Sequence, residues 1–349
     1  MKVLYGGVQK ERYDPKRRGM SFEYQSFFRA LQGMEGIEVV EFPFDPILEM
    51  GREHFQAAFF KAVQQEKPAL VFLFMHTDEL LPETLRRVRD ELHIPIVGWF
   101  ADDYWRFWNY SRHYAPVLSL AVTTSLQAVG WYKSSGLENV FHSQWACNTR
   151  DFYPIENLPQ DIDVSFVGQY KPPRARLFKI LAEVGIEVRA FGVGWPGGRV
   201  SHEELLRIFA HSKINLNIAD RPALTHPKVL ARLFLKKSLN EVVPDFHFRD
   251  NFKSWMHFKI PHIHARPFEL AGSRAFTLSS YVEGIEKYYE PDKEMVFFKT
   301  PPECIEKIKY FLGHSEERMR IREAGYARTL QEHTYEARFR EIFKKIGLG

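Results

Sequence analysis

The N-terminal half carries the side chains best suited to acid–base chemistry, and they follow predicted strands. His76 ends an apolar stretch, 69–75, and Asp102 and Asp103 follow another, 94–100. Histidine titrates near neutral pH and carboxylates accept protons, so any of the three could deprotonate a hydroxyl group; a structural hydrogen-bonding role is the alternative for each. Neighbouring side chains on extended backbone point opposite ways. Only one aspartate is therefore expected to reach a substrate, which disfavours hydrolysis by paired acids.

A glycine-rich loop in the second half is the next candidate. Residues 192–197 read Gly-Val-Gly-Trp-Pro-Gly and formally match the G-x-G-x-x-G dinucleotide motif after a predicted strand. The match is weak because the next helix begins only near Ser201, but it keeps a nicotinamide-dependent oxidoreductase open. We interpret Gly192 and Gly194 as letting the backbone approach a nucleotide, with Trp195 as a wall. A tight turn is the alternative.

Three charged side chains of this half could bind different parts of a nucleotide. Glu269 begins a predicted helix, where the helix dipole favours a carboxylate that could also accept both hydroxyls of a ribose. Arg266 and Arg174, the latter on the turn after Gly168, could neutralise a diphosphate. Plain helix capping and solvated arginines are the alternatives.

A long irregular insertion, 221–265, interrupts the second half. His257, His262 and His264 fall within or at the end of it, but no carboxylate or cysteine pattern accompanies them, so a metal site is disfavoured. Interleaved basic and aromatic residues could bind an anionic acceptor, a membrane surface or single-stranded nucleic acid. We favour a helical excursion with lysines lying over a small core, and contact with an acceptor or partner second. The residues are Lys228, Arg232, Lys236, Lys237, Arg249, Lys253 and Lys259 among Phe234, Phe246, Phe248, Phe252, Trp255 and Phe258.

The elements that must position these residues form two series of apolar strands alternating with amphipathic helices. Such a pattern predicts parallel sheets covered on both faces, and ligands then bind beyond the carboxyl ends of the strands. We predict an α/β fold of two Rossmann-like domains facing across a cleft: 1–150, and 151–330 with the insertion, joined by an irregular linker, 147–163. The helix in 331–349 is expected to pack back on the first domain. The predicted strands are 3–5, 37–44, 69–75, 94–100, 118–123, 140–144, 163–168, 187–191, 214–218, 275–278 and 296–298.

Composition limits the classes of protein to consider. The 349 residues are 45% hydrophobic, which predicts globular domains. The formal charge of +4 is too small to indicate a nucleic-acid partner. Two isolated cysteines, Cys147 and Cys304, fit a reducing cytoplasm rather than a disulfide framework. A charged N-terminal region argues against a signal peptide, and the longest apolar run is too short to span a bilayer. We expect a cytoplasmic protein, with peripheral membrane contact through the insertion as an alternative.

A set of short segments carries a family resemblance through its order and spacing, although no single segment is diagnostic. The segments are Val97–Asp103, Thr123–Ser125, Asp163–Gly168 with Arg174, Phe191–Trp195, Ser212–Asn217, Arg266–Gly272, Tyr288–Glu294, and Glu332–Tyr335 with Arg338. From about the third predicted strand to the C-terminus, the chain resembles the CgeB-like (spore-maturation type) glycosyltransferases of the two-domain GT-B class.

The resemblance implies transfer of a sugar from a nucleoside-diphosphate donor, with a UDP-sugar favoured and neither a cofactor nor an obligatory metal. It implies a donor in the C-terminal domain and an acceptor, whether a glycan, a lipid-linked molecule or a protein, in the N-terminal one. The catalytic candidates stay Asp103, His76 and Asp102. The residues expected to bind the donor are Gly168, Arg174, Gly192, Gly194, Trp195, Asn217, Arg266, Glu269 and Glu294.

The chain departs from the family pattern at one position. Related retaining enzymes carry two glutamates eight residues apart, and Pro261 stands eight residues before Glu269. The carboxylate that usually contacts the hexose is therefore missing or displaced, which leaves the stereochemical outcome open. It also keeps a binding protein that lost catalysis as an alternative.

Overall fold

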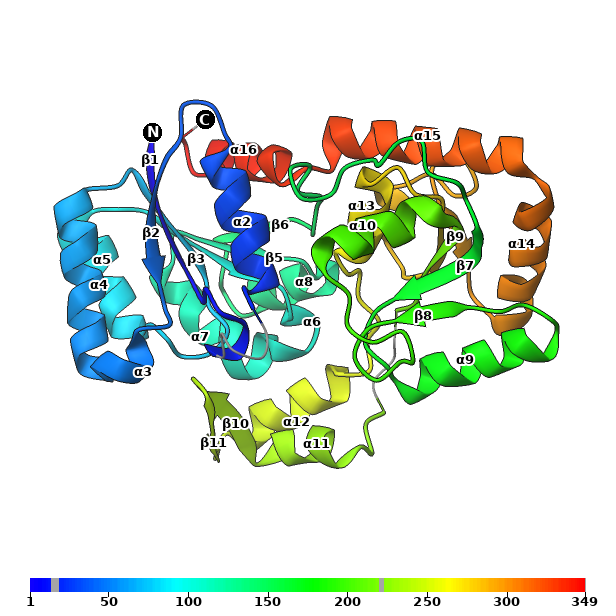
Figure 1. The fold of residues 1–349 in the computed structure, drawn as a ribbon. Coiled ribbons are helices and arrows are strands. Elements are labelled where there is room, and N and C mark those ends of the chain that lie inside the picture. The colour runs from blue at the N-terminus through cyan, green and yellow to red at the C-terminus, as the bar shows by residue number, and fades with distance from the viewer. Residues whose placement is uncertain (14–18, 220–222, 349) are drawn as a thin grey trace. The chain divides into compact units, whose positions relative to one another are not determined.

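The computed structural model describes residues 1–13, 19–219 and 223–348. The chain divides into two compact units, each built from several segments (Figure 1). The first unit contains Met1–Gln144, Pro222–Ile260 and Arg338–Gly349, and the second contains Trp145–Arg221 and Pro261–Ala337.

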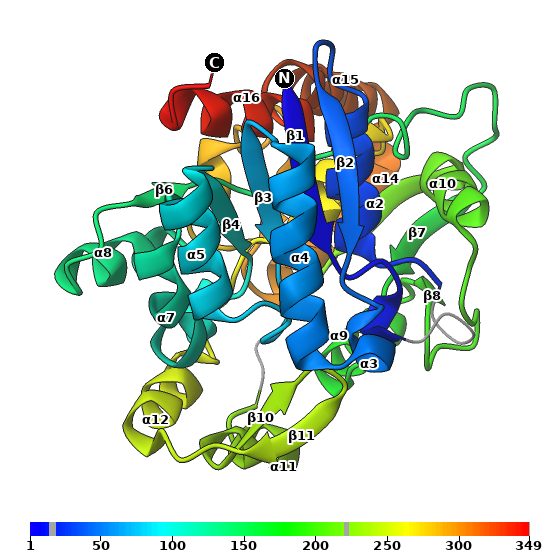
Figure 2. The same cartoon turned by 90° about the vertical axis from the view of Figure 1, so that its left-hand side faces the viewer.

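The first unit contains a parallel sheet of six strands in the order β2-β1-β3-β4-β5-β6 (Figure 2). This is the doubly wound arrangement in which the first strand lies between the second and the third. The strands are β1 (Lys2–Gly7), β2 (Glu38–Pro43), β3 (Leu70–Phe74), β4 (Ile96–Phe100), β5 (Leu120–Thr123) and β6 (Val140–His142).

Helices cover both faces of this sheet because its central strands are apolar on both sides. Val71 packs in one core with Phe59 of α4 (Arg52–Glu66), while its neighbour Phe72 contacts Phe27 of α2 (Phe22–Gln32) and Phe339 of α16 (Tyr335–Lys345) at ring distances of 6.1 and 5.3 Å. The terminal helix thus contributes to the first unit through Phe339. The helices are α2 (Phe22–Gln32), α3 (Ile47–Met50), α4 (Arg52–Glu66), α5 (Pro82–Leu92), α6 (Asp103–Arg106), α7 (Arg112–Tyr114), α8 (Leu126–Ser134) and α16 (Tyr335–Lys345).

The second unit repeats the same plan with five parallel strands in the order β13-β12-β9-β7-β8. Its apolar core joins the three middle strands, through Val164, Leu216 and Leu278, to the helices of the unit. The helices contribute residues such as Leu177 and Ile308. The strands are β7 (Ile162–Val167), β8 (Arg189–Phe191), β9 (Ser212–Asn217), β12 (Thr277–Ser280) and β13 (Val296–Phe298). The helices are α9 (Pro172–Glu183), α10 (His202–His211), α13 (Arg266–Gly272), α14 (Pro301–Gly313) and α15 (Ser315–Glu332).

The predicted α/β class with two separate parallel sheets is confirmed. Local sequence also marks where individual helices begin, as α10 shows. A capping box begins α10, with the Ser201 hydroxyl accepting from Glu204 N–H and the Glu204 carboxylate accepting from Ser201 N–H. The boundary between the units falls after Gln144, so the segment 147–163, predicted as a linker, belongs to the second unit.

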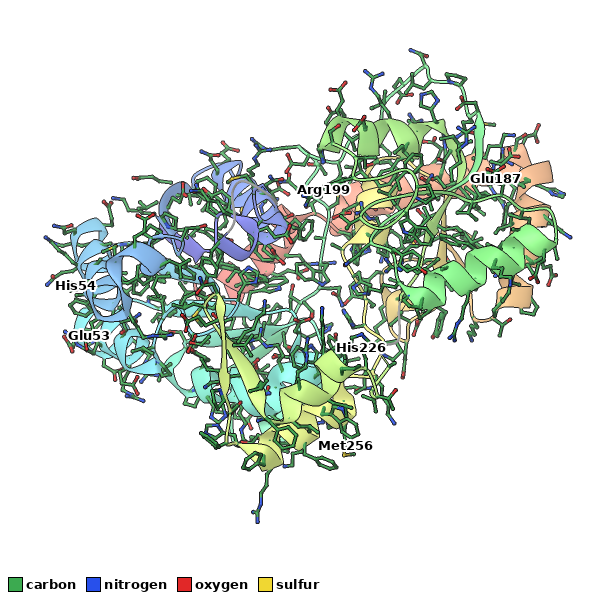
Figure 3. The ribbon with its side chains drawn as sticks, turned by 60° about the horizontal axis from the view of Figure 1, so that its bottom comes forward. Glu53, His54, Glu187, Arg199, His226 and Met256 are labelled. Carbon is green, nitrogen blue, oxygen red and sulfur yellow. The ribbon has the colours of Figure 1, made fainter. Side chains whose placement is uncertain are left out.

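The insertion differs from its prediction. The assignment of 221–265 to the C-terminal domain is wrong for most of its length, because the described residues 223–260 belong to the first unit. The Arg232 guanidinium lies 4.1 Å from the ring of Trp105, and Asn109 donates to Asn251 over 3.0 Å. Positions 221 and 222 lie outside the described residues. His226 and Met256 mark the segment in Figure 3, and its elements are α11 (Pro227–Leu230), β10 (Leu235–Ser238), β11 (Glu241–Pro244) and α12 (Phe248–His257).

Candidate functional site

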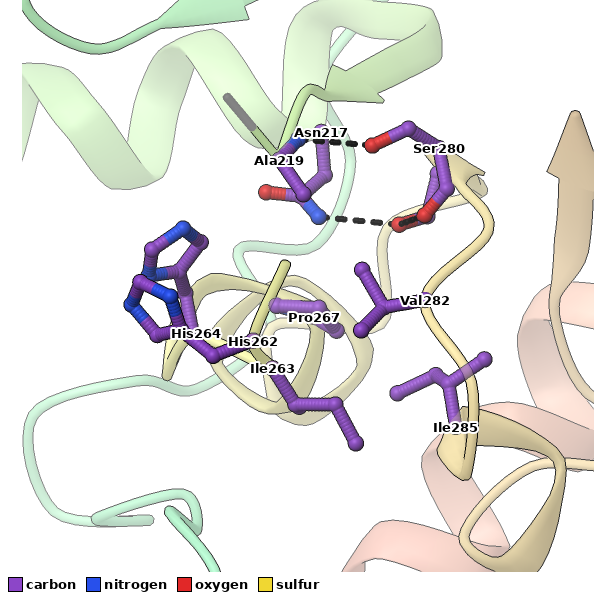
Figure 4. A pocket seen from close by; sticks show the side chains of 10 residues that line it. Asn217, Ala219, His262, Ile263, His264, Pro267, Ser280, Val282 and Ile285 are labelled. Atoms are coloured by element: carbon purple, nitrogen blue, oxygen red, sulfur yellow. Dashed lines mark hydrogen bonds between the residues drawn. The ribbon is translucent and has the colours of Figure 1, made fainter. Parts of the chain in front are cut away.

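A pocket of the second unit opens where β9 and β12 end (Figure 4). These two strands are parallel neighbours, so their carboxyl ends meet at one edge of the sheet. Ligands of doubly wound sheets bind beyond this edge. The pocket is lined by Asn217, Ala219, His262, Ile263, His264, Pro267, Ser279, Ser280, Val282 and Ile285.

Hydrogen bonds fix the polar wall of this pocket. Asn217 Nδ2 donates to Ser279 Oγ over 2.8 Å, and the Ala219 N–H donates to Ser280 Oγ over 2.6 Å. The bonds link the last residue of β9 and the segment that follows it to the end of β12, as Figure 4 shows. They hold amide and hydroxyl groups at the pocket wall, where such groups can recognise a polar ligand.

The opposite side of the pocket carries two histidines and an apolar surface. The rings of His262 and His264 lie 4.1 Å apart at 72°. His257 does not join them, because it belongs to the first unit and its ring lies against Trp131. Over residues 1–13, 19–219 and 223–348, no group of three or more His, Cys, Asp or Glu side chains could hold a metal ion.

Glu269 lies on α13, the helix that also carries the pocket residue Pro267, but it is not among the pocket-lining residues. Its carboxylate is buried and lies 2.7 Å from Arg266 Nη1. Burial raises the pKa of Glu269, while the charges of Arg266 and His202 lower it. The structure therefore joins two residues predicted to bind the donor as an ion pair, next to the pocket.

Arg174 is buried at the carboxyl end of the same sheet. Its guanidinium donates to the carbonyl oxygens of Gln169 and Ile218 over 2.8 and 3.2 Å, and so connects the segments that follow β7 and β9. A side chain on Gly168 would approach the same guanidinium to 3.1 Å. These hydrogen bonds hold the two loops together. Arg174 would therefore have to interact with a diphosphate while it keeps its bonds to the two carbonyl oxygens.

The glycine-rich loop follows β8 and packs closely on the segment after β7. Gly192 has φ +121°, and a Cβ there would lie 2.3 Å from the Gly168 oxygen, while one on Gly194 would lie 2.6 Å from Tyr170 Cβ. Trp195 packs against Phe178, with the ring centroids 5.0 Å apart, rather than lining the pocket. Close loop packing thus accounts for these glycines without a nucleotide, which weakens the argument for a nicotinamide enzyme.

Glu294 lies in the turn before β13 and is not brought to the pocket. Its carboxylate accepts from the Glu290 N–H over 2.8 Å, and its N–H donates to the Glu290 carbonyl over 2.9 Å. The same turn touches α15, where a Cβ on Gly325 would lie 2.3 Å from the Glu294 oxygen. The structure gives Glu294 a role in shaping the turn.

In the first unit, His76 lies beyond the carboxyl end of β3. Its Nε2 lies 3.8 Å from Glu23 Oε2, and its side chain is 36% exposed. A carboxylate beside an imidazole can orient the ring, and an oriented, partly exposed imidazole is suited to act as a general base. Glu23 was missed in the sequence because it stands on a helix 53 positions away, and only the fold brings it to His76.

The two aspartates after β4 lie in different environments, although they stand at the start of α6 rather than on the extended backbone that the prediction assumed. Asp103 is fully buried, and its oxygens accept hydrogen bonds from Ser111 and from Tyr132, the latter over 2.8 Å. It is therefore inaccessible to an acceptor in this structure, and it holds α6 to α8 instead. Asp102 is half-buried, and its carbonyl accepts from the Trp105 N–H at the start of α6.

The buried Asp103 predicts a pH dependence of stability. Burial raises the pKa of Asp103 from 3.8 to about 7, so the folded state prefers the protonated acid. The stability gained from the protonated Asp103 is fully present below pH 3.8 and is lost as the pH rises through about 7. The free energy of unfolding should fall over this interval, by an amount on the order of a few kcal/mol, relative to Asp103→Asn. Urea unfolding across pH 4 to 8 tests this; identical pH profiles for the two proteins would contradict it.

Comparisons with known proteins agree with this architecture. Residues 247–344 match the family described as glycosyl transferase-like. No curated protein sequence matches the chain. Among solved structures, the chain is similar to sucrose-phosphate synthase from Thermosynechococcus elongatus, with TM-score 0.60, 12% identity and 99% of both chains covered.

Two further solved structures show the same likeness. HepE of Anabaena in complex with UDP has TM-score 0.59 and 10% identity, with 99% of this chain and 100% of that one covered. The DNA-modifying enzyme β-glucosyltransferase, whose substrate is uridine diphosphoglucose, has TM-score 0.55 and 14% identity with 99% of both chains covered. At such identities the likeness establishes the fold.

None of the described helices combines the length and the apolar character needed to cross a bilayer. The two doubly wound units and the full-length structural likeness together define the architecture. The chain has the fold of the GT-B glycosyltransferases, and its residues 247–344 match a glycosyl transferase-like family.

Proposed function

We propose that the protein is a glycosyltransferase that moves a sugar from a nucleoside-diphosphate donor to an acceptor hydroxyl. The observation that carries this proposal is the pocket at the carboxyl ends of β9 and β12. It lies in the unit that contains most of the family match, and its His262, His264, Pro267 and Ser280 all fall within that match. The solved GT-B structures that bind UDP or uridine diphosphoglucose give the proposal further support.

In the proposed reaction, the second unit binds the donor. Asn217 and Ser280 present amide and hydroxyl groups to it from the pocket wall. Glu269, on the helix that also carries the pocket residue Pro267, accepts hydrogen bonds from the ribose. Arg266 and Arg174 supply positive charge as the diphosphate leaves, so that neither a metal ion nor a cofactor is required. The finer assignments of a UDP-hexose donor and a CgeB-like subgroup belong to the same proposal.

The first unit binds the acceptor in this proposal. His76 removes the proton of the acceptor hydroxyl, and Glu23 stabilises the imidazolium that forms. The acceptor oxygen then bonds to the anomeric carbon as the bond from that carbon to the diphosphate breaks. We place this chemistry on His76 because it is partly exposed, whereas Asp103 is buried.

Thermal stability with a panel of UDP, GDP, ADP, TDP, CMP and NAD tests the binding part of the proposal. A ligand at 100 times its Kd stabilises the folded state by about 2.7 kcal/mol, which corresponds to a rise in Tm of roughly 5 °C. We expect this rise with one nucleoside diphosphate, UDP first. A rise with NAD alone would favour an oxidoreductase and contradict the proposal.

A further inference from the structure

The segment 222–260 exposes aromatic side chains to an unusual degree. The chain has 30 phenylalanines, and those exposed in the described residues all lie in this segment. They are Phe234, Phe246, Phe248 and Phe252, with exposed fractions of 59, 77, 51 and 51%. Exposed apolar side chains gathered in one region mark a contact surface rather than a random scatter.

Helix α12 is oriented with its apolar side outward. Phe248, Phe252 and Met256 are spaced by four residues, so they share one side of the helix, and all three are exposed. The side that packs on the first unit carries Asn251 and Ser254, which are buried. A helix that served only to fill a core would have the reverse arrangement.

The exposed rings continue from the helix to the hairpin that precedes it. Phe248 lies 6.0 Å from Phe234 and 6.3 Å from Phe246, measured between ring centroids. Leu235 on β10 and Val242 on β11 add exposed aliphatic side chains, 39 and 62% exposed. We call the exposed apolar residues of this segment the insertion surface. They are Leu230, Phe234, Leu235, Val242, Phe246, Phe248, Phe252 and Met256.

Basic side chains dominate the charges around the insertion surface. Of the three carboxylates between positions 223 and 260, Asp245 is buried beside His247, Asp250 is paired with Arg112 over 2.7 Å, and Glu241 is exposed. The exposed basic residues are Lys228, Lys236, Lys237, Arg249, Lys253 and Lys259. A second copy of the chain would bring the same positive charge to this surface, so the charge favours an anionic partner.

Two anionic partners combine negative charge with apolar contact: a bilayer of anionic lipid and single-stranded nucleic acid. Nucleic acid uses aromatic rings as stacking platforms. The insertion surface also exposes Leu230, Leu235, Val242 and Met256, whose aliphatic side chains offer no ring for a base to stack on. Entry into the boundary between headgroups and acyl chains accommodates both kinds of side chain.

We propose that the insertion surface binds the interfacial region of an anionic phospholipid bilayer. In this arrangement the phenylalanines and aliphatic side chains enter the acyl boundary, while the surrounding lysines and Arg249 contact lipid phosphates. The protein lies on the bilayer without crossing it. This inference concerns where the protein binds and is independent of the proposed reaction.

Co-sedimentation of the full chain with vesicles tests the proposal. We expect binding to phosphatidylcholine vesicles that contain phosphatidylglycerol, little binding to phosphatidylcholine alone, and weaker binding as salt is raised. The double variant Phe246→Ser/Phe252→Ser should bind at least about tenfold more weakly. Lys236→Gln/Arg249→Gln should reduce the dependence on anionic lipid. All these side chains are exposed, so unchanged melting temperatures should show that the variants fold.

The matched control is Met319→Ser/Leu330→Ser on α15, whose side chains are also exposed, at 49 and 44%. It should bind vesicles like the wild type. The proposal is overturned if the wild type ignores anionic vesicles, or if the control loses binding equally. It is also overturned if Phe246→Ser/Phe252→Ser keeps its binding to vesicles and instead converts a dimer to a monomer, or loses binding to a single-stranded oligonucleotide. Nucleotide binding is measured separately, so failure here leaves the proposed function standing.

Discussion

His76→Ala is expected to lower the kcat of sugar transfer by about 10²- to 10⁴-fold, the range that general base catalysis contributes. The reason is the pair that His76 forms with Glu23, with 3.8 Å between the imidazole Nε2 and the carboxylate. Because His76 belongs to the first unit, the Kd of the nucleoside diphosphate should stay unchanged. Steady-state release of the nucleoside diphosphate in the presence of acceptor measures kcat, and calorimetry measures Kd.

The controls for this prediction separate a base from a structural histidine. His54→Ala removes an exposed histidine of α4 (Figure 3) and should leave kcat unchanged. Glu23→Gln should lower kcat less than His76→Ala, because the imidazole itself is retained. If Asp102→Asn abolishes activity while His76→Ala retains it, the base is Asp102 and the assignment to His76 is wrong.

Glu269→Gln is expected to weaken the binding of the nucleoside diphosphate by about 10- to 100-fold, which is the value of hydrogen bonds to a charged group. Glutamine keeps the shape of the side chain, so Arg266 retains an oxygen partner in place of the carboxylate at 2.7 Å. If the carboxylate binds ribose, the wild type should also prefer UDP over 2′-deoxy-UDP. That preference should disappear in Glu269→Gln. Calorimetry with both nucleotides measures the four affinities.

Glu187→Gln is the matched control, because Glu187 is an exposed glutamate of the same unit (Figure 3). It should bind both nucleotides like the wild type. An undiminished preference for UDP over its 2′-deoxy form in Glu269→Gln would show that Glu269 only pairs with Arg266. The ribose would then be recognised by another group.

Periodicity predicted most of the fold because the strands of both sheets are apolar on two sides. Val71 and Phe72, adjacent in one predicted strand, pack on opposite layers of helices, as a buried parallel strand requires. The existence of the insertion was predicted, but the unit to which it belongs was not, for a physical reason. The chain leaves the second unit after β9 and returns at Pro261, and the residues between are placed by contacts such as Arg232 with Trp105. Local sequence does not encode contacts of that range.

The candidate site was predictable where it depends on strand ends. Asn217 was expected at the donor, and it lines the pocket together with Ser279 and Ser280, which end β12. The predicted strand 275–278 stopped short of both serines, so their hydroxyls were not assigned to the site. The sequence also did not predict which of the neighbouring side chains Asp102 and Asp103 is exposed to solvent. Asp103 is buried because its partners Ser111 and Tyr132 come from later elements.

The most direct test of the central claim is release of nucleoside diphosphate from a panel of nucleotide sugars. The purified protein is incubated with UDP-, GDP-, ADP- and TDP-sugars, with and without candidate acceptors, and the liberated diphosphate is quantified. We predict slow release from one donor, UDP-sugar first, that increases with acceptor and falls by at least about tenfold in both Glu269→Gln and His76→Ala. Binding of a nucleoside diphosphate without release from any donor would contradict the claim, and it would indicate a binding protein that kept the fold and lost the reaction.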